Sequence, residues 1–252
     1  MESKVIVITG ASSGIGAALA RKLAESGHLL ALAARRKEEL DEIAAACGSG
    51  HLAIGTDVTK REDMERLRDK ALAHFGRIDV WINNAGRGVG KKVLELTDSE
   101  FDEIINVNLR SVLYGMQVII PYFQQQAKGH LVNVSSYLSL VPLVSYRSIY
   151  SAAKSAVNSL TASLRSDLQA SFPDIAVSLV FPGAVDTDFV KNALGGTPQK
   201  TFLKPQDVRE VADLMADLID NPKPVLFTSS RAAEEAGAYL CVSIGLEEPT
   251  AD

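Results

Sequence analysis

A glycine-rich turn after an apolar run is the feature that most constrains the fold of this 252-residue chain. Residues 5–8 are typical of a buried strand, and residues 9–16, Thr-Gly-Ala-Ser-Ser-Gly-Ile-Gly, lead into a helix expected over 15–26. Gly10 permits a tight turn. Gly14 and Gly16 let the backbone approach a phosphate at the helix N-terminus, where free N–H groups attract anions. The turn therefore predicts a dinucleotide site, with a merely connecting turn as the alternative.

Short apolar runs alternate with amphipathic stretches along the rest of the chain. We expect strands at 5–8, 29–33, 51–54, 80–82, 131–135, 176–181 and 225–227, and helices at 15–26, 38–46, 61–75, 99–126, 151–170 and 206–219. Pro121 should end or kink the helix at 99–126. This order predicts an α/β fold with a doubly wound parallel sheet covered by helices on both faces. No linker or repeat divides the chain, so we expect one domain over residues 1–252.

Composition narrows the class of partner. The formal net charge of −5 disfavours nucleic acid and anionic membranes, which usually bind basic proteins. The two cysteines, Cys47 and Cys241, are too few for a disulfide framework, and we expect no metal site. The chain shows no signal peptide and no apolar stretch of about 20 residues. We therefore expect a cytoplasmic protein.

The second and third strands end in residues that favour a particular nucleotide. Arg35 and Arg36 follow the second strand, where a carboxylate would hold a ribose 2′-hydroxyl and an arginine would hold a 2′-phosphate. This favours NADP over NAD, the alternative being a solvated basic start of a helix. Asp57 and Val58 follow the third strand, and the Asp57 carboxylate could accept from the adenine amino group or simply cap a turn.

A tyrosine and a lysine at helical spacing supply the chemistry. Tyr150 and Lys154 are four positions apart, so they lie on one face of the expected helix. A lysine placed there lowers the pKa of the phenol and makes it a usable proton donor and acceptor. After the fourth strand, the small residues Ala85 and Gly86 permit close approach of a cofactor.

These motifs resemble those of the classical short-chain dehydrogenase/reductase family over roughly residues 4–190. The resemblance implies a Rossmann-type fold, a nicotinamide cofactor and a catalytic set of Asn108, Ser136, Tyr150 and Lys154. In that set Tyr150 is the general acid/base, and Ser136 donates to the substrate oxygen. Lys154 holds the ribose hydroxyls, and Asn108 holds a water that links Lys154 to solvent. Ser135 and Ser139 are the competing serines, and Ser136 is preferred as the second of the Ser-Ser pair.

The motifs also define the expected cofactor contacts. The loop after the sixth strand, from Pro182 to Thr187, should fold over the nicotinamide carboxamide. The full set of expected cofactor-binding residues is Gly10, Ser12, Ser13, Gly14, Ile15, Gly16, Arg35, Arg36, Asp57, Val58, Asn84, Ala85, Gly86, Tyr150, Lys154, Pro182, Gly183, Val185 and Thr187.

The substrate side is less constrained by motifs. Residues 188–205 contain Phe202 and Leu203 among other apolar residues, and with residues 139–147 they predict a mobile flap over a hydrophobic pocket. Arg147 could bind an anionic group, although an exposed loop arginine is the simpler expectation. Residues 231–252 depart from the usual end of the family, which puts its common tetramer in doubt. We still expect a homo-oligomer, a dimer or a tetramer.

The function expected from this sequence is NADP(H)-dependent oxidoreduction of a small, apolar carbonyl or alcohol substrate. A regulatory protein that binds the nucleotide without turnover is the first alternative. A β-ketoacyl-type reductase is another, and epimerisation or dehydration on the same scaffold is a third. Fold alone does not choose among the substrates.

Overall fold

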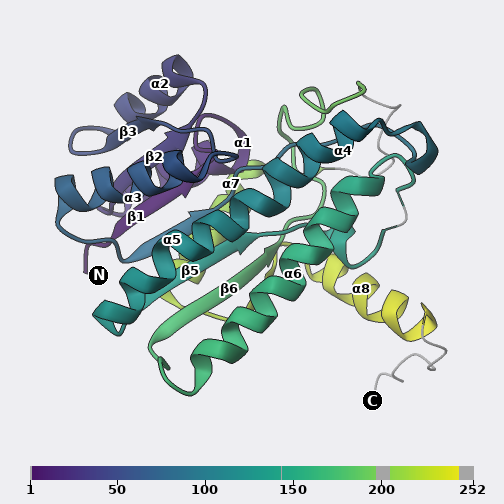
Figure 1. The fold of residues 1–252 in the computed structure, drawn as a ribbon. Coiled ribbons are helices and arrows are strands. Elements are labelled where there is room, and N and C mark those ends of the chain that lie inside the picture. The colour runs from purple at the N-terminus through teal and green to yellow at the C-terminus, as the bar shows by residue number, and fades with distance from the viewer. Residues whose placement is uncertain (1, 143, 197–204, 244–252) are drawn as a thin grey trace.

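Seven parallel strands form one sheet in the computed structural model, which describes residues 2–142, 144–196 and 205–243 (Figure 1). The strand order is β3-β2-β1-β4-β5-β6-β7. The strands are β1 Val5–Thr9, β2 Leu29–Ala34, β3 Leu52–Gly55, β4 Val80–Asn83, β5 Gly129–Val134, β6 Ile175–Phe181 and β7 Val225–Phe227. The doubly wound parallel sheet predicted from the alternating pattern is confirmed.

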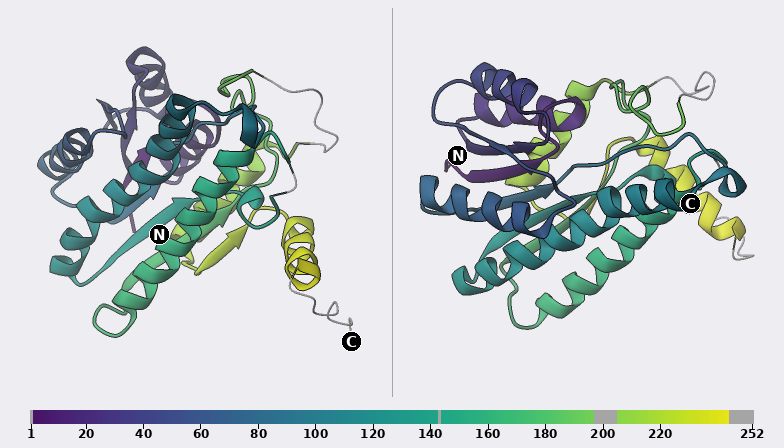
Figure 2. Two further views of the ribbon diagram at one scale, coloured as in Figure 1. Left: turned by 45° about the vertical axis from the view of Figure 1, so that its right-hand side comes forward. Right: turned by 45° about the horizontal axis from the view of Figure 1, so that its top comes forward.

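Helices cover both faces of this sheet (Figures 1 and 2). They are α1 Gly14–Glu25, α2 Lys37–Cys47, α3 Arg61–Phe75, α4 Asp98–Ile105, α5 Ser111–Gln126, α6 Ser148–Gln169, α7 Val208–Asp220 and α8 Ser230–Ser243. Apolar residues of α1, α2 and α7 pack on one face, and those of α3, α5 and α6 pack on the other. Strand β1 is fully buried because Ile6 and Ile8 face the first cluster while Val7 faces the second.

The sheet order places a switch point at the carboxyl ends of β1 and β4. Strand β1 pairs with β2 on one side and with β4 on the other, so the chain winds outward in both directions from here. Ligands of such sheets bind in the crevice at this point. The glycine-rich turn follows β1, and residues 84–86 follow β4, so both motifs lie at this crevice.

The helix predicted over 99–126 differs from the observed structure in two ways. A π-helical segment, η2, Asn106–Arg110, separates α4 from α5. Pro121 lies inside α5 and does not end it, so of the two predicted effects only a kink stays a prediction. Pro121 and Gln117, whose carbonyl loses its helical partner, are both exposed, so water can satisfy that carbonyl.

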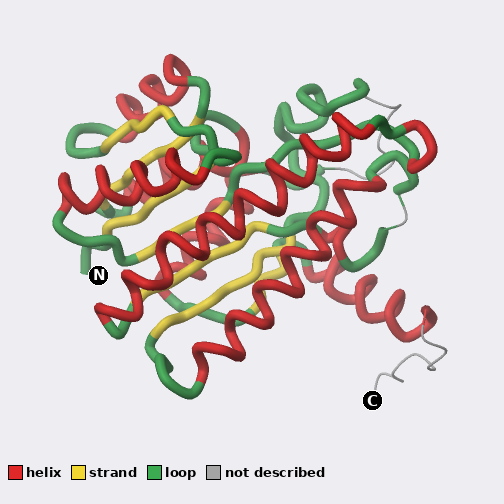
Figure 3. The backbone as a smooth tube through the Cα atoms, viewed as in Figure 1, coloured by secondary structure: helices red, strands yellow, loops and turns green. Residues whose placement is uncertain are grey.

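The C-terminal part forms a helix that the periodicity did not predict. Residues 231–243 belong to α8, which projects beyond the sheet on the side of the C-terminus (Figure 3). Its Ala232 and Ala236 are buried, whereas Leu240 is exposed. Ile244 and the residues after it lie outside the described part. Among the described residues, every helix is too short or too polar to cross a membrane.

Candidate active site

The glycine-rich turn is built for close backbone contact. A Cβ on Gly16 would lie 2.4 Å from the carbonyl oxygen of Gly10, and a Cβ on Gly10 would lie 2.8 Å from the Cα of Ala85. Gly10 and Gly14 have φ values of +69° and +56°, which favour glycine. Asn84 Nδ2 donates to the Thr9 and Gly10 carbonyls at 2.9 and 3.3 Å. The turn therefore has the close backbone packing expected of a phosphate cradle, and it is tied to the end of β4.

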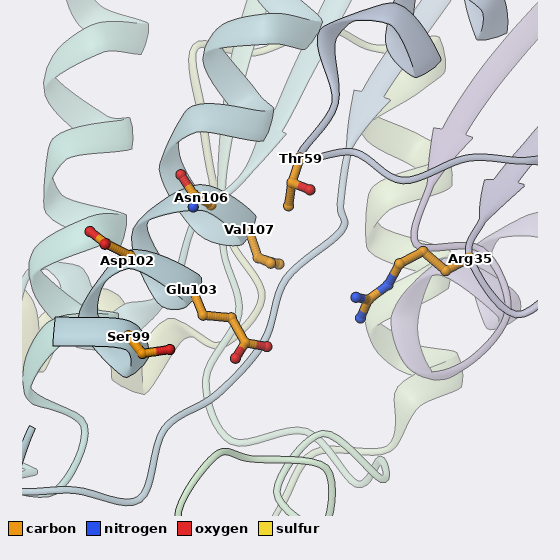
Figure 4. A pocket seen from close by; sticks show the side chains of 7 residues that line it. All are labelled: Arg35, Thr59, Ser99, Asp102, Glu103, Asn106 and Val107. Atoms are coloured by element: carbon orange, nitrogen blue, oxygen red, sulfur yellow. The ribbon is translucent and has the colours of Figure 1, made fainter. Parts of the chain in front are cut away.

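The two arginines after β2 point in different directions. Arg36 turns toward the glycine-rich turn, where its Nη2 donates to the hydroxyls of Ser12 and Ser13 at 3.1 and 2.7 Å. Arg35 faces a cavity of about 310 Å³ between the end of β2 and the start of the α4 region (Figure 4). Both side chains lie beside the crevice, where a nucleotide ribose would meet the end of β2.

Four polar residues of the α4 region face the same cavity and were missed in the sequence. The four are Ser99, Asp102, Glu103 and Asn106. Thr59 and Val107 complete the lining together with Arg35. Their spacing along the chain is that of one helical face, so this pattern was the signal that could have found them. Glu103 also forms an ion pair with Arg87, which joins α4 to the segment after β4.

Asp57 caps a turn, which was the alternative to a contact with the adenine amino group. Its Oδ1 accepts from the Thr59 backbone N–H at 3.1 Å and from the Thr59 hydroxyl at 2.7 Å. Its own backbone N–H donates to Asp63 at 2.8 Å. Val58 beside it is buried. These bonds fix the turn after β3, and they occupy one of the two carboxylate oxygens.

Tyr150 is buried in the first turns of α6, under the start of the flap. The Phe189 ring meets the Tyr150 ring edge-on, with 5.5 Å between the centroids. Burial raises the pKa of Tyr150, while the Ser136 hydroxyl and the Arg147 guanidinium act in the opposite direction. The net shift is upward, so the lowering expected from Lys154 is not seen, because desolvation of the phenolate outweighs the favourable contacts.

Lys154 and Asn108 converge on Gly86. Lys154 Nζ donates to the Val134 carbonyl at the end of β5 at 2.7 Å, and burial lowers the pKa of Lys154 to about 8. A Cβ on Gly86 would lie 3.0 Å from Asn108 Oδ1 and 3.7 Å from Lys154 Nζ. Asn108 is held by the π-helical turn and by bonds to the backbone of Arg87 at 2.9 and 3.1 Å. Only a glycine at 86 leaves open space between these two side chains.

The adjacent serines have different surroundings. Ser135 is buried, and its hydroxyl bonds to Asn158 Oδ1 at 2.5 Å and to the Ser139 hydroxyl at 3.2 Å. Ser139 is further tied to the Ser136 carbonyl and to Asn158 Nδ2. The Ser136 hydroxyl instead accepts from the Leu138 N–H at 3.2 Å and adjoins the Tyr150 phenol. Ser136 is therefore the serine that the fold brings to Tyr150.

The loop after β6 reaches the glycine-rich turn. The Pro182 carbonyl accepts from the Tyr137 N–H at 2.9 Å, and a Cβ on Gly14 would lie 3.4 Å from Thr187 Cγ2. Val185 pairs with Gln206, and Gly183 has open space around it. Phe202 and Leu203 of the predicted flap lie outside the described residues, so the flap is defined here by residues 188–196.

Arg147 is buried, with 7% of its surface exposed, so the expectation of an exposed loop arginine is wrong. Its Nη1 donates to the Val89 carbonyl at 2.8 Å. The burial arises from tertiary contacts with the segment after β4, which is distant in sequence.

An apolar cavity of about 620 Å³ lies beside the N-terminal end of α6. Val93, Leu94, Pro142 and Val144 supply its apolar lining, together with Ser148 and Ser151 of the helix. Pro142 and Val144 belong to the segment 139–147 from which an apolar substrate pocket is predicted, but Lys92 and Glu95 also line this cavity. That it binds substrate stays a prediction. Leu143 lies outside the described residues.

Comparison with known proteins decides the family. The sequence profile of the short-chain dehydrogenases matches residues 4–196, which is most of the chain. The chain belongs to the short-chain dehydrogenase family.

Relatives of this short-chain dehydrogenase agree with that assignment. An uncharacterized oxidoreductase of Staphylococcus aureus strain USA300 is 36% identical over 83% of this chain and 89% of its own. A Burkholderia phymatum short-chain dehydrogenase/reductase, solved with NAD, superposes with a TM-score of 0.88 at 27% identity, over 100% and 98% of the two chains. A Thermococcus sibiricus alcohol dehydrogenase, solved with 5-hydroxy-NADP, has a TM-score of 0.78 at 34% identity, over 90% and 95%.

The predicted family and Rossmann-type fold are thereby confirmed, and so is the oxidoreductase class at the level of the family. The two solved relatives carry different nicotinamide cofactors, so they do not choose between NAD and NADP. The roles of individual residues stay predictions.

Proposed function

We propose that this short-chain dehydrogenase catalyses reversible, NADP(H)-dependent hydride transfer between nicotinamide and a carbonyl or alcohol group. The observation that carries the proposal is the convergence of Ser136, Tyr150, Lys154 and Asn108 beside Gly86, at the crevice that holds the glycine-rich turn. A nucleotide cradle and a proton-transfer group at one switch point are what such a reaction requires.

The residues of the crevice fit a dinucleotide. Any side chain at position 16 would strike the Gly10 carbonyl, so the turn keeps its N-terminal N–H groups bare for a pyrophosphate. Gly86 keeps the floor of the crevice open between Asn108 and Lys154. Thr187 faces Gly14 from the other wall. When bound, the cofactor would supply or accept the hydride. Proton transfer and stabilisation of the developing charge are assigned to side chains of the protein.

Tyr150 moves the proton in the proposed reaction. Its raised pKa keeps the phenol protonated near neutral pH, which suits it to protonate a developing alkoxide. Ser136 donates to the same substrate oxygen as charge develops there. With a pKa of about 8, Lys154 is mostly protonated at pH 7, so its ammonium can hold ribose hydroxyls and favour the phenolate once the proton has left. Asn108 orders the water path behind Lys154.

The preference for NADP over NAD rests on the end of β2. Ala34 offers no carboxylate to a ribose 2′-hydroxyl, and Arg35 and Arg36 both reach the crevice. A guanidinium forms paired, charge-assisted hydrogen bonds with a phosphate. The substrate is expected to be apolar because Val89 and Phe189 pack in one apolar cluster with Tyr150. A cytoplasmic location, one domain over 1–252 and a homo-oligomer stay predictions.

Titration of the purified protein with NADPH and NADH, followed by nicotinamide fluorescence, tests the proposal. A panel of ketones and aldehydes is then assayed by nicotinamide absorbance. We expect tighter binding of NADPH and turnover of apolar carbonyl compounds. Binding without turnover of any panel member favours the regulatory alternative. Binding of neither nucleotide contradicts the proposal, beginning with the glycine-rich turn.

A further inference from the structure

We propose that Arg147 is a binding site for a carboxylate, and that the substrate of this enzyme is an organic acid with an apolar body. This inference rests on the proposed oxidoreductase function and narrows its substrate class. The starting observation is a guanidinium that is buried beside Tyr150 although no carboxylate of the described residues pairs with it.

The position of Arg147 is fixed by its backbone. Its N–H donates to the Val144 carbonyl at 2.8 Å, and its carbonyl accepts from Ser151 N–H at 2.9 Å. Arg147 lies three residues before Tyr150, at the beginning of α6. Its guanidinium carbon lies 5.6 Å from the centre of the Tyr146 ring. The side chain is therefore a fixed part of the wall beside the phenol.

Three segments meet around the guanidinium. A Cβ on Gly88 would lie 2.7 Å from Arg147 Nη1, 3.0 Å from Phe189 Cε1 and 3.3 Å from the Cβ of Ala193. Phe189 in turn packs against Tyr150. The segment after β4, the flap and the N-terminal end of α6 thus enclose Arg147 together with the proton-transfer group. This is where the body of a substrate would lie when its carbonyl faces Tyr150.

The electrostatics of Arg147 call for an anion. A guanidinium has five N–H donors, and the one hydrogen bond that its side chain makes to described residues is the bond to Val89. Burial lowers the pKa of Arg147, and the groups that oppose this are the phenols of Tyr146 and Tyr150. Buried charges are normally paired because desolvation is costly. Arg165 is also partly buried without a carboxylate among the described residues, but its guanidinium has two carbonyl partners, Val177 and Pro224, at 3.0 and 2.7 Å.

A carboxylate is the anion that fits this site. Its two oxygens match the planar fork of a guanidinium, which forms paired hydrogen bonds with it. The apolar neighbours Val89, Phe189 and Ala193 favour an apolar body over a polar one. The competing interpretation is that Arg147 acts only on the Tyr150 phenolate, in which case it would make no distinction between acidic and neutral ligands.

Calorimetric titration with benzoate and with benzamide separates these interpretations. The two probes share a shape and differ in charge. Each is titrated into the protein alone and into the protein with NADPH. We expect benzoate to bind more tightly than benzamide by about tenfold or more, the size of a charge-assisted hydrogen bond. An absence of preference in both conditions overturns the proposal, whatever the variants do.

Variants assign the preference to Arg147. Arg147→Met should remove it, and Arg147→Lys should keep part of it, because an ammonium retains the charge without the fork. Arg209→Met makes the same change at an exposed position on α7 and should leave the preference intact. If Arg147→Met binds both probes as the unmodified protein does, the site is elsewhere and the proposal fails.

Turnover adds a readout that distinguishes the two proposals. With a keto acid and its methyl ester, Arg147→Met should raise KM for the acid alone. Equal losses of kcat for the acid and the ester, with a shifted pH profile, would mean that Arg147 acts on the Tyr150 phenolate. That result would overturn the carboxylate site. A protein that binds no nicotinamide cofactor but prefers benzoate would contradict the proposed function while supporting the site.

Discussion

The cofactor half and the substrate half of this enzyme are built in different ways. In the cofactor half, backbone groups at the ends of β1 and β4 form the crevice, and Gly10, Gly16 and Gly86 keep it open. In the substrate half, side chains from three separated segments meet around Tyr150, and Arg147 is among them. Short glycine motifs mark the first half in the sequence, whereas no local motif marks the side chains that meet in the second. Variants in the two halves should therefore affect different measurements.

The largest effect is expected where the halves meet. Tyr150→Phe removes the hydroxyl that would transfer the proton, so kcat should fall by roughly 10²- to 10⁴-fold, the usual contribution of general acid–base catalysis. Affinity for NADPH should stay nearly unchanged, because the crevice keeps its glycines. Steady-state kinetics and fluorescence titration measure the two quantities. Tyr122→Phe makes the same change on α5, away from the crevice, and should leave kcat unaltered. Substantial turnover by Tyr150→Phe would contradict the role of the phenol.

Gly16→Ala tests the cofactor half alone. The new methyl group would lie 2.4 Å from the Gly10 carbonyl and 2.6 Å from Asn84 Nδ2, and neither contact is possible without a backbone shift. We expect the Kd for NADPH to rise by about tenfold or more, since loss of one charged hydrogen bond to the pyrophosphate alone contributes that much. Gly237→Ala on α8, where an added Cβ meets nothing within 4 Å, is the matched control. Equal Kd values for the two variants would mean that the turn does not hold the nucleotide.

The predicted and unpredicted parts of the structure follow the same division. The alternation of apolar runs and helices located the seven strands of the described sheet, most clearly where burial on both faces leaves a continuous apolar signal, as in Val5–Thr9. The glycine positions located the crevice because few residues other than glycine adopt the positive φ found at Gly10 and Gly14, although the closest contacts at Gly10 come from Ala85. The burial of Arg147 could not be predicted, since it depends on Gly88 and on the flap. Two further features could not be predicted from propensity. The π-helical turn places Asn108 against the backbone of Arg87, and α5 continues through Pro121 where the Gln117 carbonyl faces water.

Arg35 and Arg36 allow the nucleotide preference to be dissected within the cofactor half. Arg35→Asp replaces a cation that lines the cavity at the end of β2 with an anion. We expect it to weaken NADPH by roughly 10- to 100-fold and NADH much less, because only NADPH carries the 2′-phosphate. Arg36→Gln should weaken NADPH by a smaller factor than Arg35→Asp does, and NADH by a smaller factor still, since Arg36 also binds Ser12 and Ser13 of the turn that both nucleotides would use. Parallel titrations give the ratio of the Kd values for NADPH and NADH in each variant. An equal effect of Arg35→Asp on the two nucleotides would mean that Arg35 does not bind the 2′-phosphate.

The smallest effect is expected where α8 joins the substrate half. The Tyr137 hydroxyl donates to Glu235 at 3.0 Å, and Tyr137 directly follows Ser136. Burial and the Glu235 carboxylate raise the pKa of Tyr137 to about 12, so the phenol stays protonated and the bond persists throughout the neutral range. Glu235→Gln weakens this bond, which should lower the free energy of unfolding by about 1 kcal/mol. It also weakens the exposed ion pair with Arg231, which should add little.

Hydrogen exchange shows whether that loss is local. In Glu235→Gln, amides of α8 should exchange faster, and the KM for a carbonyl substrate should rise while the Kd for NADPH is unchanged. Glu234→Gln changes the adjacent, exposed carboxylate and serves as the control. A change in the Kd for NADPH without faster exchange in α8 would show that this contact acts through the cofactor half. Tyr137 would then belong to both halves. Its N–H donates to the Pro182 carbonyl, so it connects the loop bearing Ser136 to the loop after β6.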